Sequence, residues 1–200
     1  MLGCQSIERK SGGWNKATAE AYASMIAIGV IAGVLVAWAQ LPLHLPGHRV
    51  LLWMVPVLAG RMVTGRRLAA SVGASATIGT TLLLGGRLAG GVGMAPMIIL
   101  AGGVVDWVMH VLERRQMSTW RGFLFLAAAG TAANLLCLAK RLLDPAGEIF
   151  PVENLQDLMA VASSYAFFGC LAGLIGGTVG HWLAWPKGQN LPALNDTARK

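Results

Sequence analysis

The sequence predicts an all-α, polytopic membrane protein with six transmembrane helices and with both termini in the cytoplasm. Three observations lead to this fold class. Six apolar segments fill most of the 200 residues, only 12% of the residues are charged, and Lys and Arg are concentrated in one alternate set of the connections. A typical soluble domain carries about 25% charged residues. The composition therefore argues against a soluble domain, and no continuous basic face suited to nucleic acid is present.

The apolar segments define a single membrane domain. They cover residues 19–39, 50–64, 68–84, 94–112, 123–143 and 155–185. Crossing the hydrocarbon takes about 20 apolar residues, a length that the first, fourth, fifth and sixth segments reach. The second is short and the third is rich in Gly, Ser and Thr, so both are expected to pack against other helices rather than face lipid. The expected organisation is a cytoplasmic N-terminal segment (1–18), a six-helix domain (19–185) and a cytoplasmic tail (186–200).

The positions of the basic residues predict the orientation. With the N-terminus inside, twelve of the 16 Lys and Arg residues fall on the cytoplasmic side and four on the outer side. An excess of this kind is the usual topology signal of a protein of the cytoplasmic membrane. The cytoplasmic set is Arg9, Lys10, Lys16, Arg61, Arg66, Arg67, Arg114, Arg115, Arg121, Lys187, Arg199 and Lys200, and the outer set is Arg49, Arg87, Lys140 and Arg141.

Polar residues within the spans indicate a candidate binding site. A rise of 1.5 Å per residue puts several of them at a shared depth, about 10–12 Å below the outer surface, with two aromatic residues nearby. Hydroxyl, amide and aromatic groups of this kind suit a small uncharged or zwitterionic ligand. Hydrogen bonding between helices is the competing interpretation. The polar residues are Thr80, Thr81, Asn134, Ser163 and Ser164, and the aromatic residues are Trp53 and Tyr165.

Asp106 lies deeper, at about the level of Arg61, and His110 follows it by one helical turn. A carboxylate and an imidazole at this spacing suit metal binding or proton transfer. A buried ion pair between Arg61 and Asp106 is the leading interpretation, since it neutralises two charges within the bundle. No metal site and no cofactor are predicted.

The first outer loop, residues 41–49, is the most distinctive connection. Its two prolines stiffen it and Gly47 permits a tight reversal of the chain. His44 and His48 are candidates for contacting a ligand, and two histidines without a third ligand are a weak metal signal. Surface histidines near the headgroups are the alternative.

Small residues at intervals of four mark close helix packing. Gly29 and Gly33 share this spacing, as do Gly169, Gly173 and Gly177. Such residues let helix backbones approach each other, either within the bundle or against another membrane protein. Ala23 and Ala27 form the same kind of pair near the cytoplasmic end of the first span.

Together these features resemble the substrate-binding S component of an energy-coupling-factor (ECF) vitamin transporter. The resemblance covers residues 19–185 and includes the six spans, Ala23 with Ala27, and the Pro/Gly/His outer loop. It implies that Ala23 and Ala27 dock on a transmembrane coupling subunit, that loop 41–49 closes over a ligand, and that partner ATPases supply energy. The chain begins Met1-Leu2 rather than with the Met-His of cobalt and nickel members, which argues against a metal substrate.

The expected function is therefore uptake of a small micronutrient through binding to this subunit, and the chain is not expected to be an enzyme. It has no Gly-x-x-x-x-Gly-Lys-Ser/Thr loop for hydrolysing ATP itself. A stand-alone permease or small channel is the alternative. An intramembrane enzyme is less favoured, because the candidate serines lie towards the outside whereas His110 and His181 lie towards the inside.

Overall fold

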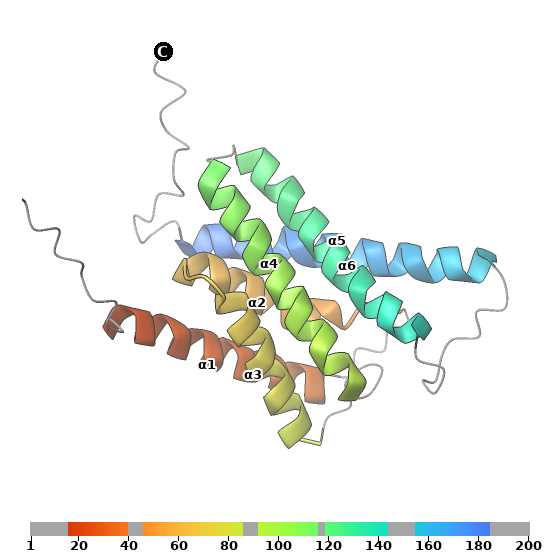
Figure 1. Cartoon of the computed structure of the whole chain (residues 1–200), viewed down its shortest axis with the longest axis horizontal. Coiled ribbons are helices and arrows are strands. Elements are labelled where there is room, and N and C mark those ends of the chain that lie inside the picture. Colours follow the sequence, from red (N-terminus) through yellow and green to blue (C-terminus); the bar gives the residue numbers. More distant parts are fainter. Residues whose placement is uncertain (1–15, 40–45, 86–91, 116–118, 144–154, 185–200) are drawn as a thin grey trace, which may run out of the picture.

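A computed structural model describes residues 16–39, 46–85, 92–115, 119–143 and 155–184, and every regular element in these ranges is helical (Figure 1). The helices are α1 (Lys16–Trp38), α2 (Val50–Thr64), α3 (Ala69–Leu83), α4 (Ala95–Arg115), α5 (Thr119–Leu143) and α6 (Leu155–Ala184), with a 3₁₀ turn, η1 (Val92–Met94), before α4. All six predicted segments are thus helical. The bounds of α2 are those predicted. The end of α4 and the start of α5, which follow each other in the chain, extend three and four residues beyond the predicted bounds.

Helix length separates the six helices into two groups. Within the described ranges, α1, α4, α5 and α6 are long and apolar enough to cross a membrane, whereas α2 and α3 are apolar helices of 15 residues each. At 1.5 Å per residue, 15 residues span about 22 Å, less than the roughly 30 Å of hydrocarbon. The fold is therefore that of a membrane protein with four long helices and two short ones.

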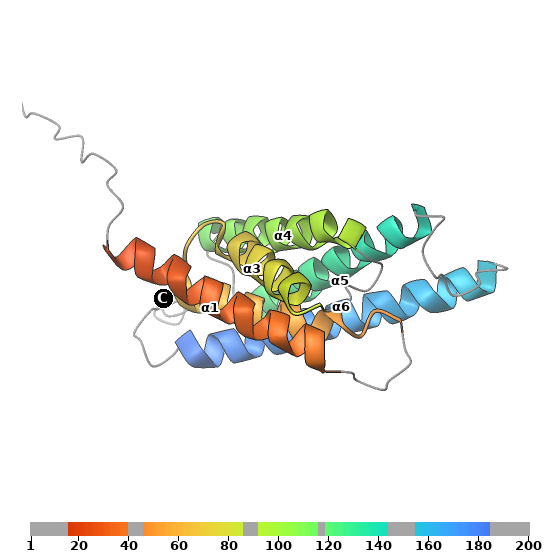
Figure 2. The same cartoon turned by 90° about the horizontal axis from the view of Figure 1, so that it is seen from below.

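The helices pack in a closed order. Each contacts its neighbours in the sequence α1, α3, α4, α5, α6, α2 and back to α1, and α2 also contacts α3 and α4. Figure 2 shows the result as two layers, with α3, α4 and α5 on one side and α1 and α6 on the other. Because α2 contacts four other helices, it is the central element of the bundle.

The core is built around α2. Met54, Val57 and Leu58 are almost completely buried, and the side chain of Arg61 is fully buried one turn before the end of the helix. This burial explains how α2 tolerates Arg61, since side chains from neighbouring helices rather than lipid surround the charge.

Glycines bring several helix pairs into close contact. A Cβ added at Gly130 of α5 would collide with the backbone at Gly169 of α6, and one added at Gly173 would collide with the backbone at Leu126. In α1, a Cβ added at Gly29 or Gly33 would likewise collide with the backbone of α3. Most of the four-residue spacing in the sequence therefore serves packing within the bundle.

Ala23 and Ala27 of α1 differ from these glycines, because both are exposed. They lie on the side of α1 that faces away from the other helices, together with Ile26, Val30 and Ile31, which are 49%, 41% and 59% exposed. The small residues of α1 thus lie on two faces of the helix. The glycines pack against α3, and the alanines face away from the bundle. An unoccupied small-residue face of this kind is available to lipid or to another membrane protein.

Candidate functional site

Two helices hold the end of loop 41–49, which precedes α2. The side-chain amide of Asn134 in α5 donates a hydrogen bond to the carbonyl of Gly47 at 3.3 Å, and the hydroxyl of Ser164 in α6 donates one to the carbonyl of Pro46 at 2.8 Å. The Asn134 amide also donates to the carbonyl of Tyr165 at 2.8 Å. Two uncharged donors on adjacent helices therefore bind two consecutive carbonyls of the loop. We call Pro46, Gly47, Asn134, Ser164 and Tyr165 the loop seat.

Gly47 can approach Asn134 and Tyr165 this closely only because glycine has no side chain. Its φ angle is +84°, a region that L-residues rarely adopt. A Cβ at this position would lie 3.0 Å from the Tyr165 ring and 3.2 Å from the Asn134 amide nitrogen. The next residue, His48, places its ring edge-on to Phe168, with ring centroids 6.2 Å apart. Aromatic side chains and neutral donors therefore surround the end of the loop.

The other predicted site residues do not gather at the loop seat. Thr81 donates to the carbonyls of Thr77 and Gly33, and Thr80 packs against Gly33, so both lie at the contact between α3 and α1. Ser163 is exposed and donates to the carbonyl of Met159 in its own helix. The expected shared pocket is therefore not formed by these three residues. Thr80 and Thr81 serve packing between helices, and Ser163 faces away from the bundle.

Two further predicted residues are placed differently. Trp53 is buried in the apolar core, near the start of α2. His44 lies outside the described residues, as do residues 41–43 and 45 of the loop. Of the predicted ligand-contacting residues, the structure therefore brings Asn134, Ser164 and Tyr165 together, with His48 beside them.

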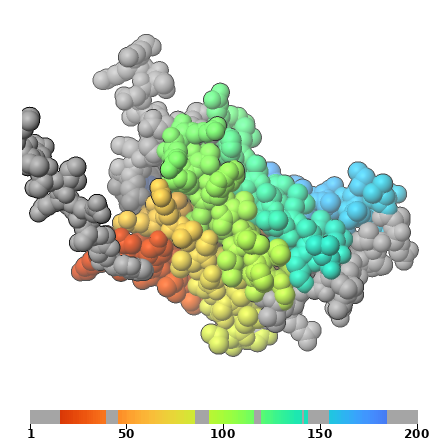
Figure 3. All heavy atoms as spheres, in the orientation of Figure 1, coloured from red at the N-terminus to blue at the C-terminus, as the bar shows by residue number. Residues whose placement is uncertain are grey.

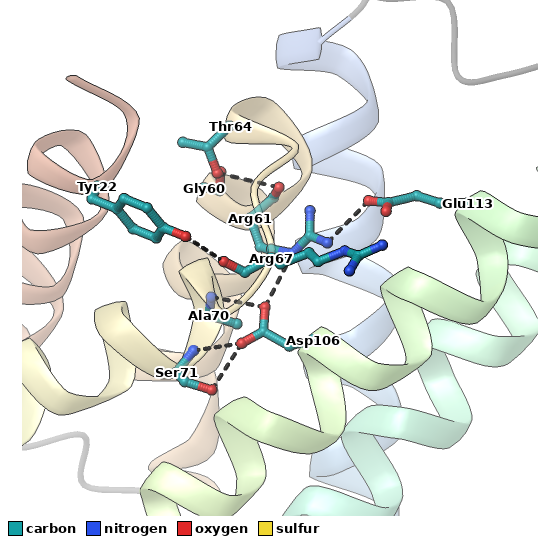
Figure 4. A network of polar contacts seen from close by, with 9 residues as sticks. All are labelled: Tyr22, Gly60, Arg61, Thr64, Arg67, Ala70, Ser71, Asp106 and Glu113. Atoms are coloured by element: carbon teal, nitrogen blue, oxygen red, sulfur yellow. Dashed lines mark hydrogen bonds and ion pairs between the residues drawn. The ribbon is translucent and has the colours of Figure 1, made fainter. Parts of the chain in front are cut away.

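Arg61 lies in the last turn of α2, away from the loop seat, and forms a charge network there. Figure 4 shows this network from close by. The Nε of Arg61 donates to Oδ1 of Asp106 at 3.1 Å, which is the expected ion pair, and its Nη2 donates to Oε1 of Glu113 at 3.0 Å. The third nitrogen, Nη1, is buried and makes no hydrogen bond to any described residue. Removing either partner from such a pair would leave a charge without compensation.

Asp106 also caps the start of α3. Its Oδ1 accepts from the backbone nitrogen of Ala70 at 3.1 Å, and its Oδ2 accepts from the backbone nitrogen and hydroxyl of Ser71 at 2.9 and 2.8 Å. The first backbone N–H groups of a helix lack partners within the helix, and a carboxylate there also complements the helix dipole. The residue preceding α3, Leu68, provides no side-chain cap. Asp106 therefore joins α2, α3 and α4 through one carboxylate.

Glu113 and Ser71 were not among the predicted members of the network. Asp106, His110 and Glu113 lie at positions i, i+4 and i+7, so they share one face of α4. That spacing was a signal from which Glu113 could have been found. The capping role of Asp106 depends on how α3 approaches α4, and no local pattern indicates it. His110 is half-buried on the same face.

The described residues contain no cluster of three His, Cys, Asp or Glu side chains that could hold a metal ion. Within this part of the chain, the carboxylates of the network bind Arg61 and the start of α3 instead. The chemistry available at the loop seat is hydrogen-bond donation by neutral groups. The chemistry available at the charge network is ion pairing.

Comparison of the chain with protein-family models, with curated proteins and with solved structures gives no match.

Proposed function

We propose that the chain is the substrate-binding subunit of a membrane transporter that takes up a small micronutrient, a vitamin or a cofactor precursor. In this proposal all six helices span the cytoplasmic membrane, both termini are cytoplasmic, and the loop seat lies towards the outside. Partner ATPases, acting through a transmembrane coupling subunit, provide the energy. The chain itself catalyses no reaction.

The loop seat is the observation that supports this proposal best. Asn134 and Ser164 bind the carbonyls of Gly47 and Pro46, respectively, and each lies nine residues from the end of its helix that this proposal places towards the outside. When the loop moves away, the same two donors become available to acceptor groups of a ligand. Neutral donors beside the rings of Tyr165 and Phe168 suit a small molecule without strong net charge. The loop and the ligand thus use the same two donors in turn, and the loop acts as a lid.

The exposed face of α1 supports a role as a subunit. Ala23 and Ala27 lie outward, while the glycines of the same helix are already engaged with α3. A face of small residues allows the close approach of a helix from another membrane protein. Docking of the coupling subunit on Ala23 and Ala27 is therefore part of the proposal.

Native mass spectrometry of the purified protein tests ligand binding directly. We expect one small metabolite to accompany the wild-type protein and to be depleted in Ser164→Ala, since one net hydrogen bond contributes about 0.5–1.5 kcal/mol, or roughly two- to twelvefold in affinity. Ser163→Ala is a matched control, because this neighbouring hydroxyl bonds only within α6. Equal retention by both variants would show that the loop seat does not hold the ligand.

Transport assays separate this proposal from a stand-alone permease or channel. The purified chain in liposomes should bind the co-purified metabolite without accumulating it or equilibrating it across the bilayer. Uptake by the chain alone would favour the permease. Absence of any bound metabolite in well-folded protein, from cells grown under several nutrient conditions, would contradict the binding function itself.

A further inference from the structure

The adjoining ends of α4 and α5 carry three exposed arginines. Arg114 and Arg115 form the end of α4, and Arg121 is the third residue of α5. The two helices pack against each other and their ends lie side by side, at the top of Figure 1. Only residues 116–118 connect them, so the two ends lie within about 15 Å of each other. In the space-filling view of Figure 3, the green ends of these two helices form the upper edge of the coloured part.

The carboxylates of the described residues are engaged elsewhere. Glu20 lies beside Lys16 on α1, and both Asp106 and Glu113 bind Arg61. Asp157 lies in the first turn of α6, and because α6 runs antiparallel to α5, it is at the opposite end of the helix pair from Arg121. No carboxylate in the part of the chain that the structure describes is therefore left to neutralise Arg114, Arg115 and Arg121. Among the described residues, these three arginines therefore remain available to an anion.

The start of α5 adds a second attraction for an anion. Its first turn contains no acidic residue. The first N–H groups of a helix have no partner within the helix, and together with the positive end of the helix dipole they favour negative charge at this point. Arg121 stands in this same turn, which places a guanidinium and a helix N-terminus together.

An apolar strip beside the arginines indicates which kind of anion fits. Trp120 is 71% exposed, and Leu124, one turn along the same face, is 51% exposed. Phe125, one turn from Arg121, is 39% exposed. Tryptophan prefers the level of the lipid headgroups, and exposed apolar side chains beyond it face the acyl chains. A free phosphate ion would use the arginines but not this strip, whereas a phospholipid would use both.

We propose that the adjoining ends of α4 and α5 bind the phosphodiester headgroup of an anionic phospholipid. Arg114, Arg115 and Arg121 contact the phosphate, and the strip from Trp120 to Phe125 lies along an acyl chain. The site is separate from the loop seat and does not depend on what the loop seat binds. Basic sites between transmembrane helices on the cytoplasmic side recognise such headgroups through the same interactions.

Lipid titration of the delipidated full-length protein tests the site. Native mass spectrometry would follow binding of cardiolipin, phosphatidylglycerol and phosphatidylcholine to the wild type and to the triple variant R114Q/R115Q/R121Q. Each surface arginine contributes about fivefold to the affinity for anionic lipid, so the triple variant should bind cardiolipin about 100-fold more weakly. Phosphatidylcholine should bind weakly to both proteins.

A charge-matched variant provides the control. R9Q/K10Q/K16Q removes three positive charges that also lie on the predicted cytoplasmic side, and cardiolipin binding should remain within about twofold of the wild type. Equal losses in the two triple variants would overturn a defined site in favour of diffuse attraction. Melting in neutral detergent would check folding, and if the triple variant failed to fold, Arg121→Gln alone should still show the fivefold loss.

Competition experiments separate the alternatives. Millimolar inorganic phosphate should displace little cardiolipin, and displacement as effective as that by phosphatidylglycerol would overturn the lipid assignment in favour of a free phosphate site. A poly-glutamate peptide that binds the wild type more tightly than cardiolipin, and loses affinity in R114Q/R115Q/R121Q, would instead indicate an acidic protein partner.

Discussion

At the scale of single residues, Asp106 accepts four hydrogen bonds from residues of α2 and α3 through one carboxylate. It accepts hydrogen bonds from Arg61, from the backbone of Ala70, and from the backbone and hydroxyl of Ser71. We expect Asp106→Ala to reduce the free energy of unfolding by about 3–5 kcal/mol, because it leaves a buried guanidinium short of a partner and uncaps α3. Denaturation in mixed detergent micelles would measure this loss.

Glu113→Gln is the matched comparison within the same network. The side chain of Glu113 is 33% exposed, and a glutamine oxygen still accepts a hydrogen bond from Arg61. The expected loss in unfolding free energy is below about 1 kcal/mol, as for other partly exposed pairs. Ligand affinity in the folded fraction should change little in either variant. A stable Asp106→Ala protein that no longer binds its ligand would contradict the structural role assigned to this carboxylate.

The loop seat shows where sequence reasoning succeeds and where it stops at this scale. Depth along a helix follows from counting residues, so Asn134 and Ser164 were expected at one level and do meet the same loop. Rotation about the helix axis does not follow, because lipid-facing and protein-facing sides of a membrane helix are both apolar. Ser163 and Ser164 are neighbours about 100° apart, and only the packing of α6 decides which one reaches the loop.

At the scale of helices, the contact between α5 and α6 depends on glycine at Gly130. A methyl group added there would meet the backbone of Gly169 and the backbone nitrogen of Gly173, neither of which moves without separating the helices. We therefore expect Gly130→Ala to lower the free energy of unfolding by about 1–3 kcal/mol. Unfolding of the purified variant in detergent would measure the change.

Gly122 of the same helix offers the control, because a Cβ there meets nothing within 4 Å. Gly122→Ala should leave stability unchanged or raise it by up to about 1 kcal/mol, through the better helix propensity of alanine. If both substitutions had the same effect, close backbone packing would not explain the glycines of α5.

The helices themselves were largely predictable, and the reason is compositional. Each apolar run is bounded by charged residues or by Gly and Pro, as at Gly65 after α2, so each helix begins and ends within four residues of its run. The pairing of the helices was not predictable, because it depends on contacts between distant segments. The position of α3 against α1, which removes Thr80 and Thr81 from the expected pocket, is an example of such a contact.

At the scale of the whole molecule, the two short helices decide how many times the chain crosses the membrane. If α2 and α3 do not span, they form a hairpin that enters from the outside and returns, and the four long helices keep the same orientation. The turn between them contains Arg66 and Arg67, and Arg61 just before it bonds to Glu113, two residues from the end of α4. Tyr22, in the second turn of α1, donates a hydrogen bond to the carbonyl of Arg67 at 2.8 Å.

These contacts place the α2–α3 turn level with the ends of α1 and α4 that are predicted to be cytoplasmic, so we expect Arg67→Cys to react with a membrane-impermeant maleimide only from the cytoplasmic side. The variant would be made in a chain whose three native cysteines are replaced, and labelled in intact cells and in inverted vesicles. Arg49→Cys should react from outside and Arg115→Cys from inside under either topology, which makes them matched controls.

An Arg67→Cys protein that reacts from neither side, with both controls behaving as expected, would indicate four spans and a re-entrant hairpin. Labelling of Arg67→Cys from the cytoplasm would show that α2 and α3 span the membrane, although each is only about 22 Å long. Local thinning of the bilayer accommodates short helices of this kind.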